Sequence, residues 1–328
     1  MTQSARPKRA APSDKVWATL ITNLSYLAGV LTLDHSLRRV HSAYPLLALY
    51  TDALPASALA ALAARGIPSR RVDPLAASSP DARDFSSSPD PRFADTFTKL
   101  SVFSLVEHDR VVLLDSDMLV LRNMDELMDL PLDDPSLAAA ATASPSSSSR
   151  VFAASHVCAC NPLRKPHYPK SWVRENCAFT RQAADDPDRA QREGADPRGL
   201  PVAMMNGGLA VLRPSAALYR QILDKVARDG GDMYFPDQEV LSELWRDRWV
   251  ALPYVYNALK TMRRPDVHAD VWRDDEVKNV HYILSPKPWD EVDEHGNFTG
   301  DDETHGWWVA ANQRRRAEEK LKGITDGY

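Results

Sequence analysis

The sequence predicts an α/β protein with a central, mostly parallel sheet that helices cover on both faces. Short apolar runs of strand length alternate with longer segments of helical periodicity from residue 15 onward. The runs are continuously apolar, which is typical of strands buried on both faces. Apolar residues make up 44% of the 328 positions, so the chain can bury a full-sized core. We expect one domain over 15–328, preceded by a disordered tail over 1–14.

The first part of the chain alternates strands with helices. The apolar run 16–22 predicts a buried strand, and apolar residues at helical spacing predict a helix over 26–40. A second apolar run predicts a strand over 46–50. The alanine-rich segment 56–65, which a glycine closes, predicts a helix, and 67–72 predicts a third strand. Strands joined through helices imply parallel pairing.

The middle of the chain holds the most convincing central strand and the longest irregular stretch. A polar segment rich in Pro and Ser predicts a loop over 78–91, and 97–106 predicts a helix. The apolar run 110–114 predicts the central strand, which ends in an Asp-Ser-Asp motif. Segment 143–200 contains a serine run, many prolines and many charges, so we expect an irregular insert there.

The last part returns to regular elements. An apolar segment over 204–212 surrounds an Asn-Gly-Gly motif, where the backbone must approach another group closely or turn sharply. Helices are predicted over 215–227, where a serine caps the start, and over 237–245. A late strand is predicted over 277–284. The segment 305–322 predicts a terminal helix whose charged residues we expect to be solvated and paired at i,i+4 spacing.

Composition and charge exclude several classes of partner. The formal net charge of −5 disfavours a nucleic-acid surface and attachment to anionic lipid. No apolar stretch approaches the roughly 20 residues of a spanning helix, and the N-terminus lacks the apolar segment of a secretory signal. Three cysteines are too few to staple a secreted scaffold. We therefore expect a cytoplasmic protein without nucleic-acid or membrane partners, and we also expect a homodimer.

The two aspartates after the central strand indicate a site for a cation and a diphosphate. Asp115 and Asp117 lie two residues apart on extended chain, which places both side chains on one face. Ligands of parallel sheets bind at the carboxyl ends of strands, and two converging carboxylates there repel unless a cation lies between them. The chain has no P-loop and no G-x-G-x-x-G motif, so another device must hold any phosphates. A solvated cap at the end of a strand is the simpler alternative.

Several stretches, in their order along the chain, carry a resemblance to a known family. Taken together, they make the chain resemble glycosyltransferase family 8, which includes glycogenin and plant galactinol synthase. The matching stretches are Thr19-Leu20-Ile21-Thr22-Asn23 with Tyr26, Thr98-Lys99-Leu100, Val112-Leu113-Leu114-Asp115-Ser116-Asp117, Met205-Asn206-Gly207-Gly208, Asp237-Gln238, Tyr256-Asn257, and His281 with Lys287-Pro288-Trp289.

The resemblance implies a GT-A fold and a manganese-dependent transfer of a hexose, with retention, from a UDP-sugar to a hydroxyl acceptor. It implies that Mn²⁺ or another divalent cation is held by Asp115, Asp117 and His281. The catalytic residues that it implies are Asp237, Gln238 and Lys287. The residues that it places around the nucleotide sugar are Leu20, Thr22, Asn23, Tyr26, Arg92, Lys99, Asp115, Ser116, Asp117, Asn206, Gly207, Asp237, Gln238, His281 and Lys287. A covalent intermediate and front-face attack both stay open.

Differences between this chain and glycogenin predict the type of acceptor. Glycogenin carries an acceptor tyrosine shortly after its Tyr-Asn motif, whereas 258–264 contains no tyrosine. The stretch 256–265 is instead similar to galactinol synthase, which favours a small polyol such as myo-inositol. Two alternatives stay open: a glycogenin-like primer that glucosylates itself, and a UDP-sugar-binding protein without turnover. Leu284 and Ser285 stand where the family has a glycine after its metal histidine.

The insert also concentrates residues that bind soft metals. His156, Cys158, Cys160, His167 and Cys177 all fall within it. A structural zinc site is one interpretation. The C-x-C spacing differs from the usual C-x-x-C of such sites, so buried or free thiols are the favoured one.

Overall fold

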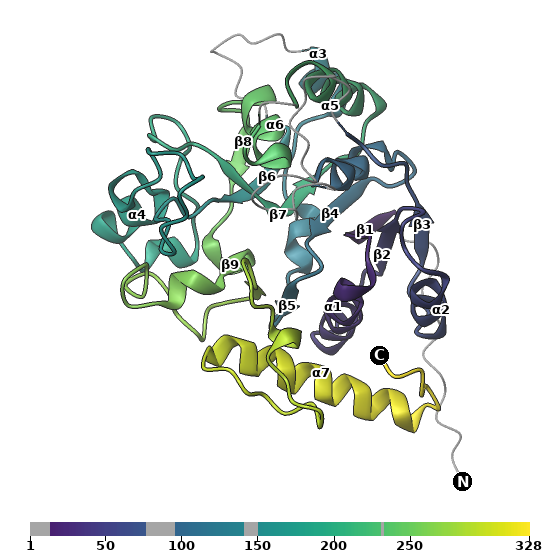
Figure 1. The fold of residues 1–328 in the computed structure, drawn as a ribbon. Coiled ribbons are helices and arrows are strands. Elements are labelled where there is room, and N and C mark those ends of the chain that lie inside the picture. The colour runs from purple at the N-terminus through teal and green to yellow at the C-terminus, as the bar shows by residue number, and fades with distance from the viewer. Residues whose placement is uncertain (1–13, 77–95, 141–149, 231–232) are drawn as a thin grey trace.

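The computed structural model describes residues 14–76, 96–140, 150–230 and 233–328 (Figure 1). Residues 1–13 of the predicted tail, the predicted loop over 78–91, the serine run and Arg92 lie outside the described residues. Among the helices that are described, none has the length and the apolar character that a membrane crossing requires.

A seven-stranded sheet lies at the centre of the molecule, in the order β3-β2-β1-β4-β7-β6-β8 (Figure 1). Strand β7 is antiparallel to both of its neighbours, and the other pairs are parallel, which confirms the predicted mostly parallel sheet. The strands are β1 (Lys15–Ile21), β2 (Leu46–Tyr50), β3 (Ser69–Arg71), β4 (Arg110–Leu114), β6 (Phe152–His156), β7 (Met205–Leu212) and β8 (Trp249–Ala251).

A second, three-stranded sheet extends from the end of β4. It consists of β5 (Met118–Val120), β10 (Asn279–His281) and β9 (Ala258–Leu259). Strand β10 pairs with β5 in antiparallel and with β9 in parallel orientation. The predicted late strand over 277–284 is thus shorter than expected and belongs to this small sheet, because residues after His281 turn away into the loop that carries Lys287.

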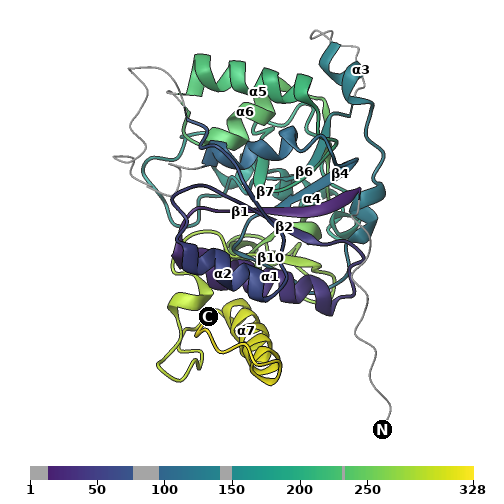
Figure 2. The same cartoon turned by 90° about the vertical axis from the view of Figure 1, so that its right-hand side faces the viewer.

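Helices cover both faces of the main sheet, as predicted (Figure 2). Alternate strand residues point to opposite faces, so Ala18 and Leu113 pack beneath α5 and α6, whereas Trp17 and Val112 pack against α1 and α2. The helices are α1 (Leu27–Arg39), α2 (Ala56–Ala64), α3 (Pro135–Ala140), α4 (Ala178–Asp185), α5 (Ala216–Asp229), α6 (Pro236–Leu244) and α7 (Glu303–Leu321).

The predicted helix over 97–106 is a 3-10 helix, η3 (Thr96–Ser104), rather than an α-helix. It lies between β1, α5 and α6, and every residue from 97 to 103 is buried.

The insert is more ordered than its composition predicts. It contains β6, α4 and two short 3-10 turns, and it shares a core with the last third of the chain. Trp172 and Phe179 pack in this core with Tyr254 and Trp272. Apolar partners so distant in sequence leave no local pattern, which is why the segment seemed irregular.

The terminal helix α7 packs across α1 instead of lying free in solvent (Figures 1 and 2). Trp308 is fully buried, and Arg315 is only 1% exposed because it pairs with Glu319 at 2.6 Å. Glu319 also pairs with Arg65 after α2, at 2.8 Å. The predicted i,i+4 pairing is therefore present; the expected exposure to solvent holds for Arg314 and Arg316 but was wrong for Arg315 and Glu319.

Helix α1 approaches the Asp-Ser-Asp motif so closely that only glycine fits at position 29. A methyl group there would lie 2.3 Å from the Ser116 carbonyl oxygen, whereas one at Gly306 of α7 would make ordinary contacts with Phe298 from 3.5 Å. We expect Gly29→Ala to lower the free energy of unfolding by about 1–3 kcal/mol through overpacking.

The matched variant Gly306→Ala should raise the free energy of unfolding by about 1 kcal/mol, since alanine is the better helix former. Urea denaturation followed by circular dichroism measures both. Equal effects of the two substitutions would show that α1 does not press on the motif.

Candidate active site

The Asp-Ser-Asp motif is held on both sides by backbone hydrogen bonds. The Asp115 amide donates to the Gly208 carbonyl at 2.8 Å, which continues the pairing of β4 with β7. The Tyr282 amide donates to the Asp117 carbonyl at 2.9 Å, which ties the motif to the residue after β10. Both aspartates are therefore fixed at the point where the large sheet meets the small one.

His281 meets the two aspartates, as predicted. It ends β10 directly opposite Met118 of β5, so its ring reaches back over the motif. His281 Nε2 lies 3.3 Å from Asp117 Oδ1 and 3.7 Å from Asp115 Oδ2. The side chains of His281 and Asp117 are almost fully buried, whereas 27% of the Asp115 side chain is exposed.

A chain of hydrogen bonds fixes the orientation of the His281 ring. The Gly208 amide donates to Asn206 Oδ1 at 3.0 Å, and Asn257 Nδ2 donates to the same oxygen at 2.9 Å. Asn257 must therefore turn its carbonyl oxygen toward His281 Nδ1, 2.9 Å away. Because that oxygen only accepts, His281 Nδ1 donates to it, and Nε2 is the ring nitrogen that faces the two aspartates.

The Asn-Gly-Gly motif allows the backbone to come close to the site. It lies within β7 rather than in a turn, so the interpretation of close approach is the correct one. A β-carbon at Gly208 would lie 2.3 Å from His281 Cε1, and one at Gly207 would lie 1.8 Å from Asp237 Oδ2. Any larger residue would displace the imidazole or the carboxylate.

Lys287 places a buried ammonium group beside Asp117. Its Nζ lies 2.5 Å from Asp117 Oδ2 and donates to the Tyr282 carbonyl at 2.7 Å. It also lies 5.9 Å from the centre of the Tyr26 ring. Burial would raise the pKa of Asp117, but Lys287 and His281 outweigh it and hold that pKa below its usual range. Asp117 thus stays ionised.

Lys99 forms a second buried ion-pair group on the other side of Asp115. Its Nζ lies 3.0 Å from Asp115 Oδ1, 3.1 Å from Asp237 Oδ2, and within 3.2 Å of the Gly207 carbonyl. Burial would lower the pKa of Lys99, but the two carboxylates outweigh it and raise that pKa. For Asp237, burial raises the pKa, and Lys99 opposes this effect. Gln238 is oriented by accepting the Gly207 amide at 3.1 Å.

These groups surround one cavity of about 490 Å³. Among the predicted residues, Gly207 does not line the cavity itself but forms hydrogen bonds with Lys99 and Gln238, which do. Arg92 is outside the described residues. The predicted residues that line the cavity are Leu20, Thr22, Asn23, Tyr26, Lys99, Asp115, Ser116, Asp117, Asn206, Asp237, Gln238, His281 and Lys287.

Another part of the cavity lining comes from the insert, and sequence analysis missed it. Tyr168 and Trp172 of the insert line the cavity together with Phe235 before α6. Trp172 and Phe235 stack with their ring centres 4.6 Å apart and their planes 5° from parallel. Asn257, which orients His281, also received no role. A Tyr-x-x-x-Trp pattern in the insert is the one signal that the sequence offers for this wall.

Asp115, Asp117 and His281 fit a divalent cation. Their ligand atoms all lie within 4.8 Å of one another, and the hydrogen bond to Asn257 leaves Nε2 able to bind a metal. Two carboxylate oxygens with one imidazole nitrogen suit Mn²⁺ better than Mg²⁺, which prefers oxygen ligands alone.

Known proteins resemble this chain over most of its length. Galactinol synthase 6 of Arabidopsis thaliana is 26% identical over 281 residues, which cover 84% of this chain and 74% of the relative. Galactinol synthase 1 of Solanum lycopersicum is 26% identical over 318 residues, which cover 93% of this chain and 84% of the relative.

Solved structures and a family model agree with these relatives. The galactosyltransferase LgtC superposes with a TM-score of 0.57 at 16% identity, over 94% of this chain and 99% of its own. GlyE of Streptococcus pneumoniae superposes with a TM-score of 0.56 at 16% identity, over 96% of this chain and 66% of its own. These likenesses establish the predicted GT-A fold. Because residues 18–293 match the model described as Glycosyl transferase family 8, the chain belongs to that family of sugar-transferring enzymes.

Proposed function

We propose that this glycosyltransferase moves a hexose, glucose or galactose, from a UDP-sugar to a hydroxyl group of a small polyol such as myo-inositol. We further propose that the transfer depends on Mn²⁺ and retains the anomeric configuration. The observation that carries the proposal is the convergence of Asp115, Asp117 and His281 beside Lys287 in one cavity. A metal-binding group next to a buried cation is suited to a diphosphate.

The proposed mechanism depends on negative charge that develops on the leaving UDP. A bound divalent cation would act there as a Lewis acid. Lys287 adds a positive charge from the chain itself. This charge stabilises the leaving UDP most in the transition state, where the negative charge on the diphosphate has developed. Leu20, Thr22, Asn23 and Tyr26 line the part of the cavity where we place the uridine. Lys99, Asp237 and Gln238 would hold the donor hexose close to the reacting carbon.

Aromatic residues of the cavity support the proposal of a small ring-shaped acceptor. Tyr168, Trp172 and Phe235 form an aromatic wall of the cavity. Such a wall offers an apolar face for a sugar or cyclitol ring, while polar groups across the cavity bind its hydroxyls. The likeness to proteins named galactinol synthase supports an acceptor of the inositol type.

A glycogenin-like primer is the second candidate. No tyrosine follows Asn257 within 258–264, and this stretch is largely buried in the small sheet and the 3-10 turn after it. A protein that glucosylates itself would gain mass in hexose steps after incubation with UDP-glucose and Mn²⁺. We expect an unchanged intact mass.

The proposed function is tested by incubating the full chain with individual UDP-sugars, with and without Mn²⁺. UDP release should require Mn²⁺, favour one hexose donor, and increase when myo-inositol is added. Glucans and simple sugars serve as comparison acceptors. A donor consumed equally well without any divalent cation would contradict the proposed metal dependence, and UDP release that no polyol stimulates would contradict the proposed acceptor.

Loss of one proposed metal ligand should abolish metal-dependent binding of UDP. We expect Asp117→Asn to weaken UDP binding in Mn²⁺ by about 100-fold or more, because the cation loses a charged ligand that is already ionised. Isothermal titration calorimetry measures the affinity, and circular dichroism checks the fold. The control is Asp188→Asn in the exposed D-x-D of the insert, which should bind UDP normally. Unchanged affinity in Asp117→Asn would refute the metal assignment.

Asn257 should influence the metal without touching it. In Asn257→Leu the His281 ring loses the acceptor that keeps the proton on Nδ1, so we expect the affinity for Mn²⁺ to fall about 10–100-fold. Asn257→Asp keeps an acceptor oxygen for Nδ1 and should lose less. The midpoint of a Mn²⁺ titration of UDP binding gives both values. If Asn257→Leu binds Mn²⁺ as tightly as the unaltered protein does, the hydrogen-bond chain does not control the imidazole.

A further inference from the structure

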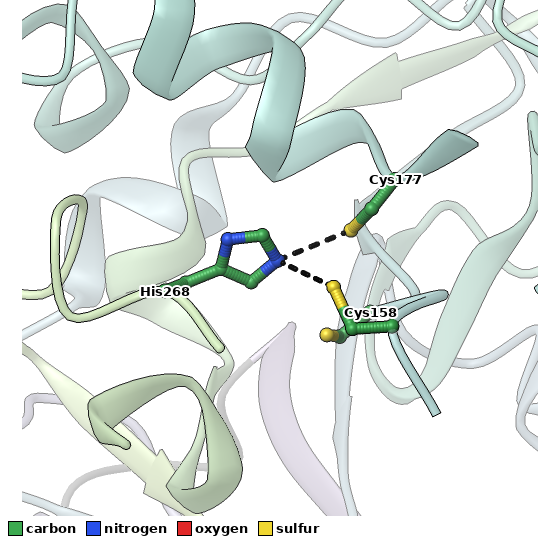
Figure 3. Close-up of side chains that lie close together, drawn as sticks. Cys158, Cys177 and His268 are labelled. Atoms are coloured by element: carbon green, nitrogen blue, oxygen red, sulfur yellow. Dashed lines mark hydrogen bonds between the residues drawn. The ribbon is translucent and has the colours of Figure 1, made fainter. Parts of the chain in front are cut away.

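All three cysteines of the chain gather around one histidine. The chain contains three cysteines in 328 residues, and Cys158, Cys160 and Cys177 lie together with His268 in one group. The four ligand atoms all lie within 4.8 Å of one another. Figure 3 shows the sulfur atom of Cys177 turned toward the His268 ring, with Cys158 beside it. The sequence motif in the insert pointed to His156 and His167 as partners, and neither belongs to this group.

The four residues come from segments that are far apart in the sequence. Cys158 and Cys160 follow β6, Cys177 directly precedes α4, and His268 lies in the last third of the chain. His268 Nε2 is 3.1 Å from Cys160 Sγ and 3.3 Å from Cys177 Sγ. A tetrahedral zinc site with the usual bond lengths has sulfur–nitrogen distances of about 3.5 Å and sulfur–sulfur distances of about 3.8 Å. The group therefore has nearly the dimensions of a closed zinc site.

The surroundings hold the ligands in place. Cys177 is 1% exposed and His268 is fully buried. The His268 ring packs against Phe179 of α4, with ring centres 5.6 Å apart. Its backbone donates to the Met262 carbonyl at 3.2 Å and accepts from the Trp272 amide at 2.9 Å. The side chain is thus directed at the sulfur atoms by packing as well as by hydrogen bonds.

We propose that Cys158, Cys160, Cys177 and His268 bind one structural Zn²⁺ ion. Three thiolates and one imidazole are a common ligand set of closed, four-coordinate zinc sites. A disulfide would join only two of the sulfur atoms and leave the third thiol and the imidazole without a role. Zinc binding uses all four groups and all the cysteines of the chain.

The position of this group indicates what the zinc does. Cys158 also lines the active-site cavity, beside Asn161, Tyr168 and Trp172 of the insert. A zinc ion would tie both ends of this stretch, at Cys160 and Cys177, to the C-terminal segment that carries His268. It would thereby hold the aromatic wall of the cavity. This role in acceptor binding rests on the proposed function, whereas metal binding does not.

The test measures metal content in the full-length protein. The chain is produced in zinc-supplemented medium, purified under reducing conditions, dialysed into zinc-free buffer with Mn²⁺, and analysed by inductively coupled plasma mass spectrometry. We expect about one zinc per chain. Replacement by Co²⁺ should give strong visible bands and near-ultraviolet thiolate charge-transfer bands, since the predicted site is tetrahedral and rich in sulfur.

Substitutions assign the site to these residues. Cys177→Ser and His268→Ala should lose most of the zinc, whereas His167→Ala, a histidine of the same insert outside the group, should keep it. Asp117→Asn should also keep it, because that aspartate belongs to the other site. If Cys177→Ser proves insoluble, the zinc content and the cobalt spectrum of the unaltered protein still decide.

Three results would overturn the proposal. They are an unaltered protein without zinc after reducing purification, a Cys177→Ser variant with full zinc content, and an intact mass that reveals a disulfide among the cysteines under non-oxidising conditions. None of these measurements uses a donor or an acceptor sugar, so they are independent of the proposed reaction.

If zinc binds, partial chelation should raise KM for the acceptor while the affinity for UDP stays unchanged. Equal weakening of acceptor binding and of UDP binding would contradict the role assigned to the aromatic wall.

Discussion

The structure depends on how three acidic groups are held together around one cavity. Asp115, Asp117 and Asp237 would repel one another at such distances, and two buried lysines make the arrangement stable. Lys287 pairs with one oxygen of Asp117 and leaves the other facing His281. Lys99 lies between the remaining two carboxylates. Lys99 and Lys287 thus keep the carboxylates charged for a cation. In the proposed reaction, the same two lysines also contact the donor.

The fold explains why these groups meet at this point. Strand β4 ends the parallel part of the large sheet, and the chain continues directly into β5 of the small sheet. The Asp-Ser-Asp motif therefore lies at a junction, where β7 approaches from one side and β10 from the other. Three contacts at this junction allow only small residues, at Gly29, Gly207 and Gly208. Gly29 of α1 lies against the Ser116 carbonyl oxygen, Gly207 of β7 against the Asp237 carboxylate, and Gly208 of β7 against the His281 ring.

The cavity has two walls of different origin. One part of the lining carries the ionic groups that meet at the junction of the two sheets, and the other part is aromatic and comes mostly from the insert. The insert reaches this position through a core that it shares with the last third of the chain. The Cys158, Cys160, Cys177 and His268 group lies in the same region. We propose that the insert distinguishes one acceptor from another and that the group of three cysteines and His268 stabilises it.

Local sequence patterns, together with the family resemblance, were sufficient for the alternation of strands and helices and for most of the charged residues that line the cavity. The apolar run before Asp115 shows that the D-x-D motif follows a buried strand, and this separates it from the exposed Asp186 and Asp188. Patterns of this kind are read within a few neighbouring residues, because side-chain direction repeats with period 2 or 3.6. The tertiary structure alone decided the antiparallel course of β7, the role of Asn257, the aromatic wall and the partnership of His268 with cysteines about 90 to 110 residues away. These features arise where distant segments pack on one another, and such contacts leave no periodic signal in either segment.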